Sequence, residues 1–416
     1  MPFEALFVPA DVREATSERA WVQAMLDFEA ALAGAQGKRE LADRIAASAP
    51  PALTDRSTGN PVPELVAALP DGAHRGATSQ DVMDTAAVLV AKRTLPLIEA
   101  SLAGAAAACA RLAADHRSTP MAARTLLQQA LPTTFGFKAA GWLAGLDEAR
   151  DLLAAVPLEV ELGGAAGTLA SFGDQGLEVL ARVAEELGLA EPVLPWHTRR
   201  LRFGQLGAAL ALAAGAVEKI ALDVKLMAQT EVGELAESSA GGRGGSSTLP
   251  HKRNPVGSAL AIACAHGVRG AASVLIAVQA HEHERAAGAW QAEWDALSRA
   301  LSLTGGAAAA LREGLGGLEV HADRMRANLE LTGDLVMTEA VASRLDRPDA
   351  KAVVGEVALA AAESGQPLRE ALIADSRVEL SEDEIDRALD PAAYLGSAGA
   401  FVDRALEAHG RRGDGG

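Results

Sequence analysis

The sequence predicts an all-α protein. Aromatic residues make up only 3% of the 416 residues, whereas hydrophobic residues make up 49%. An abundance of Ala and Leu with few aromatic side chains favours close helix packing over β-sheet. Apolar side chains also recur at helical spacing, most clearly in a stripe from Leu201 through Leu212 and Ile220 to Met227.

The first clear helix lies within residues 21–34, where Trp21, Met25, Phe28 and Leu32 fall on one face. Gly34 follows these residues, and glycine is common where helices end.

A second helix should begin near Ser79, which can cap its first turn, while Asp81 suits the positive end of the helix dipole. We expect it to run past Lys92, with a kink or a break at Pro96. Residues 101–114 then form an alanine-rich helix.

Residues 256–280 are rich in Ala, Leu, Val and Ile and predict a central buried helix. The sequence HEHER follows at 281–285. If it is helical, His281 and His283 point about 200° apart and cannot share one metal ion. Trp290 and Trp294 should pack together, because they are four residues apart.

Charged residues become more frequent from about Thr332, and Ser381 to Glu384 is a capping box for a short helix. The expected organisation has three parts. These are an N-terminal helical domain at 1–110, a central domain of long helices at 111–335, and a small C-terminal helical domain at 336–416.

The net charge of −17 argues against broad contacts with nucleic acid or an anionic membrane surface. The N-terminus has no signal peptide pattern, and uninterrupted apolar runs fall short of the roughly 18 residues of a membrane helix. We therefore expect a cytoplasmic protein without membrane or nucleic-acid partners. Cys109 and Cys264 are isolated, so a thiolate zinc site is not expected, and we expect no metal or other cofactor.

The first chemical motif is HRGATSQDVMDT at 74–85. Thr78, Ser79 and nearby backbone N–H groups at a helix start could bind a carboxylate. The alternative is a simple cap, because Ser and Thr are common there. His74 at the start of the motif is a further candidate.

The second motif is RTLLQQALPTTFG at 124–136, which we interpret as a loop that leads into a helix. Thr125 and Gln128 either satisfy backbone groups or face a ligand. The glycine-rich turn at 161–171 lacks a dinucleotide fingerprint and is interpreted as support for a pocket. His197 lies just before the long stripe that begins at Leu201.

The third motif, GGRGGSSTLPHKRN at 241–254, has few apolar side chains and four glycines around one arginine. It predicts a mobile loop that offers backbone N–H groups, hydroxyls and cations to a small anion.

Together the three motifs resemble the fumarase/aspartase superfamily, which includes adenylosuccinate lyase and argininosuccinate lyase. They occur in the order expected for that superfamily, and the resemblance covers nearly the whole chain. It implies an all-helical subunit of three domains around a central bundle of long helices. It also implies a homotetramer whose core is built from the central helices of four subunits, with active sites shared between subunits.

Within the superfamily, the sequence is most similar to the branch of cycloisomerases that act on 3-carboxy-cis,cis-muconate. The lyases commonly carry a His at the position of Leu126 and a Glu at the position of Ala259. A His paired with a Glu forms a proton relay for a leaving group, which an intramolecular lactonisation does not need. The segments at 283–294 and 394–406 also resemble this branch.

The resemblance implies a tricarboxylate substrate and a role for each candidate residue. Ser246 is the proton-transfer group, with Ser247 as the alternative, and Lys252 stabilises the charge of an aci-carboxylate intermediate. The candidate substrate-binding residues are Thr78, Ser79, Thr125, Gln128, Asn254, Arg285, His74 and His197.

Two other interpretations remain open. The first is a lyase that releases fumarate from an N-substituted or nitro-substituted succinate, although Leu126 and Ala259 argue against the members that depend on His. The second is an inactive helical scaffold, because fold alone does not guarantee function. The intact spacing of Ser246, Lys252 and Asn254 argues against that scaffold.

Overall fold

The structure is a computed structural model, and it describes residues 2–245 and 248–413. It is almost entirely helical in these residues, which confirms the predicted all-α class. The elements up to the third motif are α1 (Glu4–Phe7), α2 (Ala10–Ala15), α3 (Glu18–Ala35), α4 (Arg39–Ala46), α5 (Val62–Ala67), α6 (Ser79–Asp115), β1 (Pro120–Thr125), β2 (Gln128–Thr134), α7 (Phe135–Ala154), the 3-10 helix η1 (Ala170–Gln175), α8 (Gly176–Leu187), α9 (Leu201–Met227), β3 (Leu235–Ala236) and η2 (Ala240–Gly242).

The remaining elements are α10 (Val256–Ala277), α11 (Ala289–Gly316), β4 (Glu319–Val320), α12 (Ala322–Leu329), η3 (Glu330–Thr332), η4 (Leu335–Met337), α13 (Thr338–Ala342), α14 (Ala350–Ser364), α15 (Leu368–Ala374), α16 (Glu382–Leu389), η5 (Pro391–Ala393) and α17 (Ala398–Gly413). The two short sheets, β1 with β2 and β3 with β4, are both antiparallel pairs.

The chain divides into two compact units, each made of three segments. The first unit comprises residues 1–103, 148–221 and 257–312, and the second comprises residues 104–147, 222–256 and 313–416.

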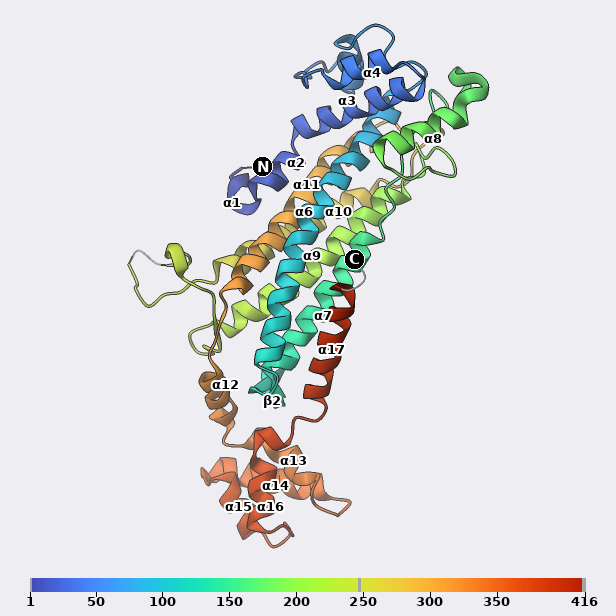
Figure 1. Ribbon diagram of the computed structural model, residues 1–416. Helices are drawn as coiled ribbons and strands as arrows, with labels where there is room; N and C mark the ends of the chain where they lie inside the picture. Colours follow the sequence, from blue (N-terminus) through green and yellow to red (C-terminus); the bar gives the residue numbers. More distant parts are fainter. Residues whose placement is uncertain (1, 246–247, 414–416) are drawn as a thin grey trace. The chain divides into compact units, whose positions relative to one another are not determined.

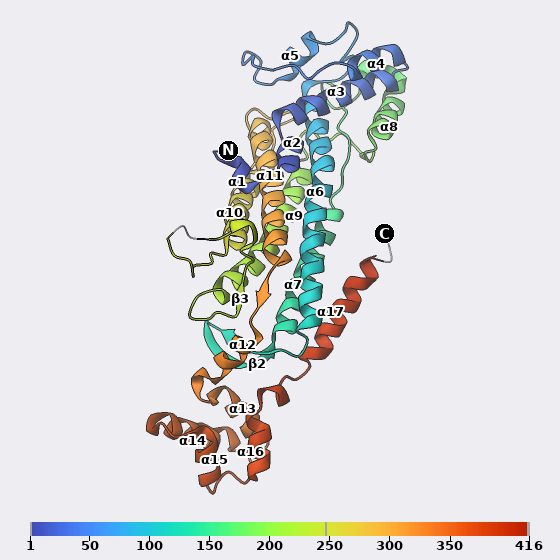
Figure 2. The same cartoon turned by 60° about the vertical axis from the view of Figure 1, so that its left-hand side comes forward.

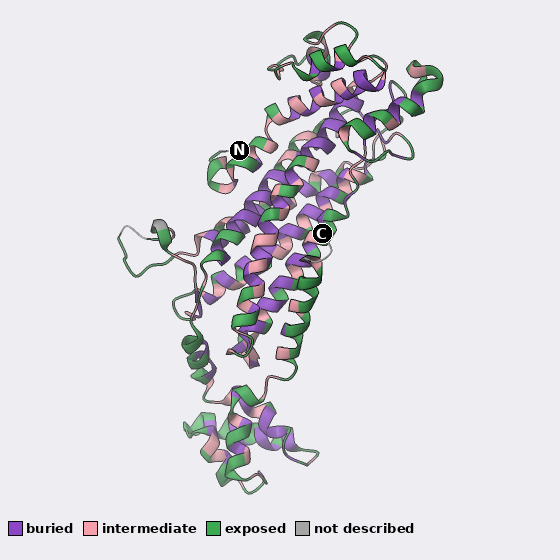
Figure 3. Cartoon of the chain, in the orientation of Figure 1, coloured by how far each residue is buried: buried purple, intermediate pink, exposed green. Residues whose placement is uncertain are grey.

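In the first unit, the segments of α6, α9, α10 and α11 run side by side, as the views in Figures 1 and 2 both show. Buried residues line the inward faces of these helices (Figure 3). Ser17 caps α3, because its hydroxyl accepts a hydrogen bond from the backbone N–H of Ala20. Trp290 and Trp294 pack edge to face with ring centroids 5.0 Å apart, as their spacing predicts.

Pro96 lies inside α6, which continues through it to Asp115. The helix therefore has no break at Pro96, and that alternative of the prediction is wrong. The alanine-rich stretch expected as a separate helix is the second half of the same helix. The continuous α6 carries the second part of the first motif at its N-terminal end, where Ser79 is its first helical residue.

The second unit has a hydrophobic core formed between its C-terminal helices α13 to α16. Val354, Leu372 and Ile385, from α14, α15 and α16, are among its buried members. Ser381 and Glu384 form the predicted capping box, with both of its hydrogen bonds present.

By length and composition alone, α6 and α10 could each cross a membrane, and their most apolar windows are 44% and 39% buried. The expectation that no segment is long and apolar enough is therefore wrong. It counted only uninterrupted apolar runs, whereas scattered polar residues leave the average over a window high. Most of α6 and of α10 belongs to the bundle of the first unit, where each lies beside other helices (Figure 1).

Gly136 near the start of α7 tests the packing of the second unit. A Cβ there would lie 2.6 Å from the Arg117 Cα and 2.6 Å from the His116 carbonyl oxygen, and backbone atoms cannot rotate away. We expect Gly136→Ala to lower the free energy of unfolding by about 1–3 kcal/mol. Gly141→Ala in the same helix meets no atom within 4 Å and should raise it by up to about 1 kcal/mol. Chemical denaturation measures both, and equal effects would contradict the packing argument.

Candidate functional site

The first turn of α6 is built around the carboxylate of Asp81, which is fully buried. Its Oδ2 accepts hydrogen bonds from the backbone N–H groups of Thr78 at 2.8 Å and Gly164 at 3.0 Å, and its Oδ1 accepts one from Gly163 at 2.9 Å. Because α6 begins at Ser79, Thr78 rather than Ser79 occupies the cap position. The glycine-rich turn is thus held against the start of α6 by hydrogen bonds.

His197 completes this cluster from the segment before α9. Its Nε2 lies 2.7 Å from Asp81 Oδ1 and 3.3 Å from Glu161 Oε1, and both carboxylates are fully buried. Gln80 fixes the backbone of His197 by donating to its carbonyl oxygen at 2.7 Å. Burial, followed by the nearby charges of Asp81 and Asp84, raises the pKa of Glu161 well above its ordinary value. The ring of His197 is therefore held by Asp81 and Glu161, and its backbone by Gln80.

The ligand atoms of Asp81, Glu161 and His197 lie within 4.8 Å of one another, which is a spacing that a metal site could use. Both oxygens of Asp81 already accept backbone N–H groups, and Glu161 Oε2 accepts the backbone N–H of Trp196 at 2.5 Å. These contacts assign the cluster a structural task, which is to order the glycine-rich turn.

Arg285 lies over the same helix start. Its guanidinium donates to Gln80 Oε1 at 3.1 Å, to Thr78 Oγ1 at 3.0 Å and to the Gly164 carbonyl oxygen at 3.5 Å. All three acceptors are neutral, and no carboxylate of the described residues forms an ion pair with Arg285. Its positive charge is therefore available to an anion, and a guanidinium can bind a carboxylate through two parallel hydrogen bonds.

The segment that carries Arg285 is not helical, so the helical interpretation of HEHER is wrong. It lies between the end of α10 at Ala277 and the start of α11 at Ala289. His283 has φ of 46°, which lies in the left-handed region and is incompatible with a continuing helix. The His281 side chain is fully buried, with Nε2 3.6 Å from Glu293 Oε1.

A buried ion cluster lies beneath the site and was not predicted. The Arg200 guanidinium, on the segment just before α9, donates to both oxygens of Asp84 at 2.6 and 2.9 Å and to Glu293 Oε1 at 3.0 Å. Trp290 Nε1 also donates to Asp84, at 3.0 Å. Burial raises the pKa of Glu293 to about 7, although Arg200 opposes the shift. The cluster joins α6 and α11 to the start of α9, so it fixes the helices that carry the site.

His74 lies just before α6 with φ of 58°. Its Nδ1 is 2.6 Å from Oε1 of Glu29, a fully buried residue of α3, and its backbone N–H donates to Glu29 Oε2 at 3.0 Å. Burial lowers the pKa of His74, but the hydrogen bond and charge of Glu29, with the charge of Asp81, outweigh it and raise that pKa.

In the second unit, Thr125 and Gln128 pair at the end of a β-hairpin, so the loop predicted for the second motif is wrong. Leu126 and Leu127 form the turn, with φ of 50° and 66°, and they are 97% and 79% exposed. Below the turn, Arg124 makes a two-pronged ion pair with Glu234 at 2.9 and 2.6 Å. The hairpin therefore presents Thr125 and Gln128 at an exposed and firmly anchored tip.

The third motif also belongs to the second unit. The backbone N–H and the side-chain amide of Asn254 both donate to the Gly244 carbonyl oxygen, at 2.9 and 3.0 Å, and close the base of the loop. Arg253 is paired with Glu319, which removes one of the cations expected to meet an anion. Lys252 is exposed. Ser246 and Ser247 lie outside the described residues.

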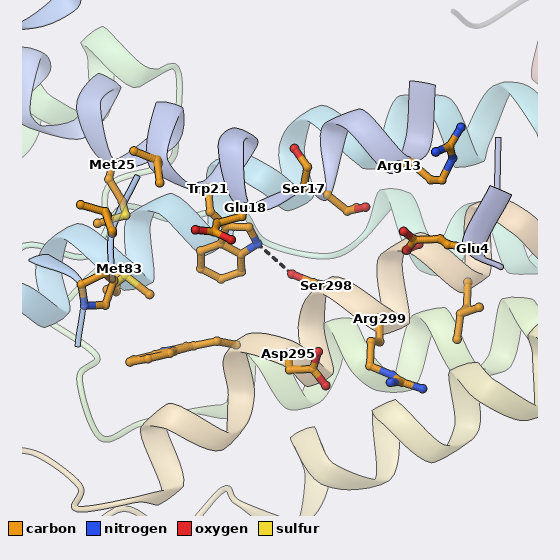
Figure 4. Close-up of a pocket in the computed structure, with 17 residues that line it drawn as sticks. Glu4, Arg13, Ser17, Glu18, Trp21, Met25, Met83, Asp295, Ser298 and Arg299 are labelled. Carbon is orange, nitrogen blue, oxygen red and sulfur yellow. Dashed lines mark hydrogen bonds between the residues drawn. The ribbon is translucent and has the colours of Figure 1, made fainter. Parts of the chain in front are cut away.

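The first unit also contains a pocket of about 710 Å³. Its walls come from α2, α3 and α11 among others, and Trp21 Nε1 donates to Ser298 Oγ at 2.7 Å across it (Figure 4). The residues that line it include none of the predicted site residues. Arg13 Nε and Trp294 Nε1 in its wall are buried without a protein partner, and water commonly satisfies such atoms.

The profile of a family described as "Lyase" matches residues 12–270, and that of "Adenylosuccinate lyase C-terminus" matches residues 333–405. The chain belongs to the fumarase/aspartase superfamily of lyases.

Three relatives of this superfamily span nearly the whole chain. The 3-carboxy-cis,cis-muconate cycloisomerase of Pseudomonas aeruginosa is 44% identical over 98% of this chain and 96% of its own. The nitrosuccinate lyase of Streptomyces davaonensis is 45% identical over 95% of this chain and 92% of its own. The crystal structure of the 3-carboxy-cis,cis-muconate lactonizing enzyme from Pseudomonas putida has a TM-score of 0.92 at 40% identity, covering 98% of this chain and 99% of that chain.

The predicted family is therefore confirmed, and the three relatives named above are enzymes. In the first unit, the structure brings Thr78, Arg285 and His197 into one hydrogen-bonded network, with Ser79 at the helix start and His74 beside it. The remaining described candidates belong to the second unit and are Thr125, Gln128, Lys252 and Asn254.

Glu161→Gln tests the electrostatics of the buried cluster. A carboxyl whose pKa is raised in the folded state stabilises the folded protein at pH values below the ordinary pKa of Glu. That contribution is lost as the pH rises through the raised pKa. We expect the unfolding free energy of the unmodified protein to fall with rising pH, by up to about 1.4 kcal/mol per unit from this group. Glu161→Gln should flatten that slope, whereas exposed Glu185→Gln should not. Denaturant titrations at several pH values measure both slopes, and an unchanged slope in Glu161→Gln would refute the assignment.

Proposed function

We propose that the protein is a cycloisomerase that converts 3-carboxy-cis,cis-muconate to a carboxymuconolactone. The observation that carries the proposal is the 44% identity, over 98% of this chain, to a cycloisomerase that bears this name. Leu126 and Ala259 also lack the side chains of the lyase proton relay, and a lactonisation has no leaving group to protonate.

In the proposed mechanism, Arg285 and the α6 start at Thr78 and Ser79 bind one carboxylate of the substrate. The unpaired charge of Arg285 supports this role, because the neutral acceptors around it leave its charge uncompensated. A second carboxylate oxygen attacks the alkene, and the bound substrate itself supplies the proximity that the step needs.

Negative charge then develops on a distal carboxylate as an aci-form, which Lys252 stabilises. Ser246 passes a proton to the neighbouring carbon. Thr125 and Gln128 bind another carboxylate from the hairpin tip, where their exposure leaves them accessible. His197 supports binding through Asp81, and Asn254 through the base of the loop.

We further propose a cytoplasmic homotetramer with active sites shared between subunits and with the three domains expected from the sequence. Exposed apolar side chains on the bundle helices of the first unit support an assembly. Leu212 on α9 is 57% exposed and Ile276 on α10 is 53% exposed. A second copy of this chain could cover them.

The second candidate function is the elimination of nitrite from nitrosuccinate, which releases fumarate. It is favoured by the 45% identity to a nitrosuccinate lyase, and nitrite is a stable anion that needs no protonation to leave. The same Arg285 and helix start would bind a succinate carboxylate.

Incubation with each substrate separates the two functions. With 3-carboxy-cis,cis-muconate, we expect the diene absorbance to be lost. With nitrosuccinate, we expect neither nitrite nor fumarate to be released. Release of nitrite with formation of fumarate, and no loss of the diene, would replace the proposal with the lyase.

Ser246→Ala tests the proton-transfer role. We expect turnover to fall by about 10²- to 10⁴-fold with an unchanged melting temperature, since the change removes one hydroxyl. Ser247→Ala is the matched control and should retain activity within about threefold. The reverse pattern would move the role to Ser247.

A further inference from the structure

The proposed lactonisation consumes one proton in each turnover. A carboxylate oxygen forms a C–O bond to one alkene carbon, and the π electrons move to the neighbouring carbon, which then takes up H⁺. The tricarboxylate becomes a lactone with two carboxylates. A serine hydroxyl can pass a proton on, but it is neutral and too weak an acid to supply one at neutral pH. The site therefore needs a second acid that water can recharge.

Among the described residues around the first motif, His74 has the geometry of such an acid. Both oxygens of the buried Glu29 carboxylate hold it, one at the ring Nδ1 and the other at the backbone N–H. Glu29 thereby fixes the ring orientation and leaves a proton on Nδ1. No described residue forms a hydrogen bond or ion pair with Nε2, and the side chain is 20% exposed, so solvent can reach it.

The backbone of His74 adopts an unfavourable conformation that places its side chain and its N–H against Glu29. Its φ of 58° is uncommon for a residue with a side chain, and such conformations persist where the surroundings enforce them. The backbone N–H bond to Glu29 is one such constraint.

The pair also lies beside the proposed carboxylate site. His74 lies four positions before Thr78, whose hydroxyl accepts a hydrogen bond from Arg285. A Cβ on Gly164, whose carbonyl also accepts from Arg285, would lie 3.0 Å from the carbonyl oxygen of Gly76. The segment from His74 to Thr78 is therefore packed against the turn that holds Arg285.

We propose that His74, with Glu29 as its positioning residue, is the acid that supplies the proton taken up by the product carbon. This inference rests on the proposed cycloisomerase function. The imidazolium gives up its Nε2 proton towards that carbon and regains one from water. In the reverse sense, a lyase would use the neutral ring to receive the proton removed from carbon.

The pH profile of kcat/KM separates this role from a structural one. The charged groups that act on the ring are Glu29 from α3 and Asp81 from α6, and they hold its proton to higher pH than burial alone would allow. Cycloisomerase activity should therefore fall at the alkaline side as the ring loses its proton. In Glu29→Gln that fall should begin at lower pH. The loss of activity should be greater at pH 8 than at pH 6, because the ring of the variant gives up its proton at lower pH.

A second variant tests the role of His74 without changing Glu29, so that a change in folding caused by Glu29→Gln does not decide the result. His74→Gly suits the positive φ, because glycine adopts this conformation readily, and it keeps the backbone N–H that Glu29 accepts, so it should fold. Its melting temperature should be lower, because the buried Glu29 carboxylate loses its imidazole partner. We expect the variant to lose about 10²- to 10⁴-fold in turnover and to regain at least tenfold of that loss with added imidazole. Ser246→Ala is the control that imidazole should not rescue.

Two results would overturn the pair. One is a Glu29→Gln profile that is lowered equally at every pH, and the other is a His74→Gly variant that imidazole does not restore. Failure of the function itself looks different, because the unmodified protein would then not consume 3-carboxy-cis,cis-muconate. If it releases nitrite from nitrosuccinate instead, the same pair predicts activity that rises, rather than falls, as the ring loses its proton.

Discussion

The buried carboxylate of Asp81 is the group on which the candidate site of the first unit depends. A carboxylate without solvent is costly unless its oxygens are satisfied. Here three backbone N–H groups and one imidazole supply the partners. Because those partners come from the helix cap, the glycine-rich turn and the segment before α9, satisfying one charge fixes three pieces of chain. Breaking such a buried arrangement typically costs about 3–5 kcal/mol.

Arg285 benefits from this construction without contacting Asp81. Its acceptors are the Thr78 hydroxyl, the Gln80 amide and the Gly164 carbonyl, all of which belong to segments that Asp81 orders. An arginine held by neutral groups is oriented but not neutralised. In a protein with a net charge of −17, this local positive charge contrasts with the global field, which repels anions.

The sequence was a good guide to the helices and a poor guide to the contacts between distant segments. The stripes around Trp21 and after Leu201 predicted helices that are present, because helical periodicity is a local property. The hairpin was missed because Leu126 and Leu127 occupy its turn with positive φ, where Gly or Asn would have signalled it.

The ion cluster and the His74 pair were missed for a different reason. Arg200 meets Asp84 across 116 residues of sequence, and Glu29 meets His74 across 45. No local pattern marks such partners, since a carboxylate in a helix looks the same whether it faces solvent or a buried base. The one available hint was that Glu29 falls within the apolar helix around Phe28, where a charge needs a partner if it is buried.

The two kinds of buried carboxylate near the first motif have different consequences for chemistry. The oxygens of Asp81 accept their hydrogen bonds from backbone groups and from a histidine that is itself buried, so this carboxylate builds structure. Glu29 holds a histidine that is partly exposed and whose second nitrogen has no described protein partner. A carboxylate behind such a ring stabilises the imidazolium while leaving its outer proton transferable. A pairing of carboxylate and imidazole is thus present in the segment just before the start of α6.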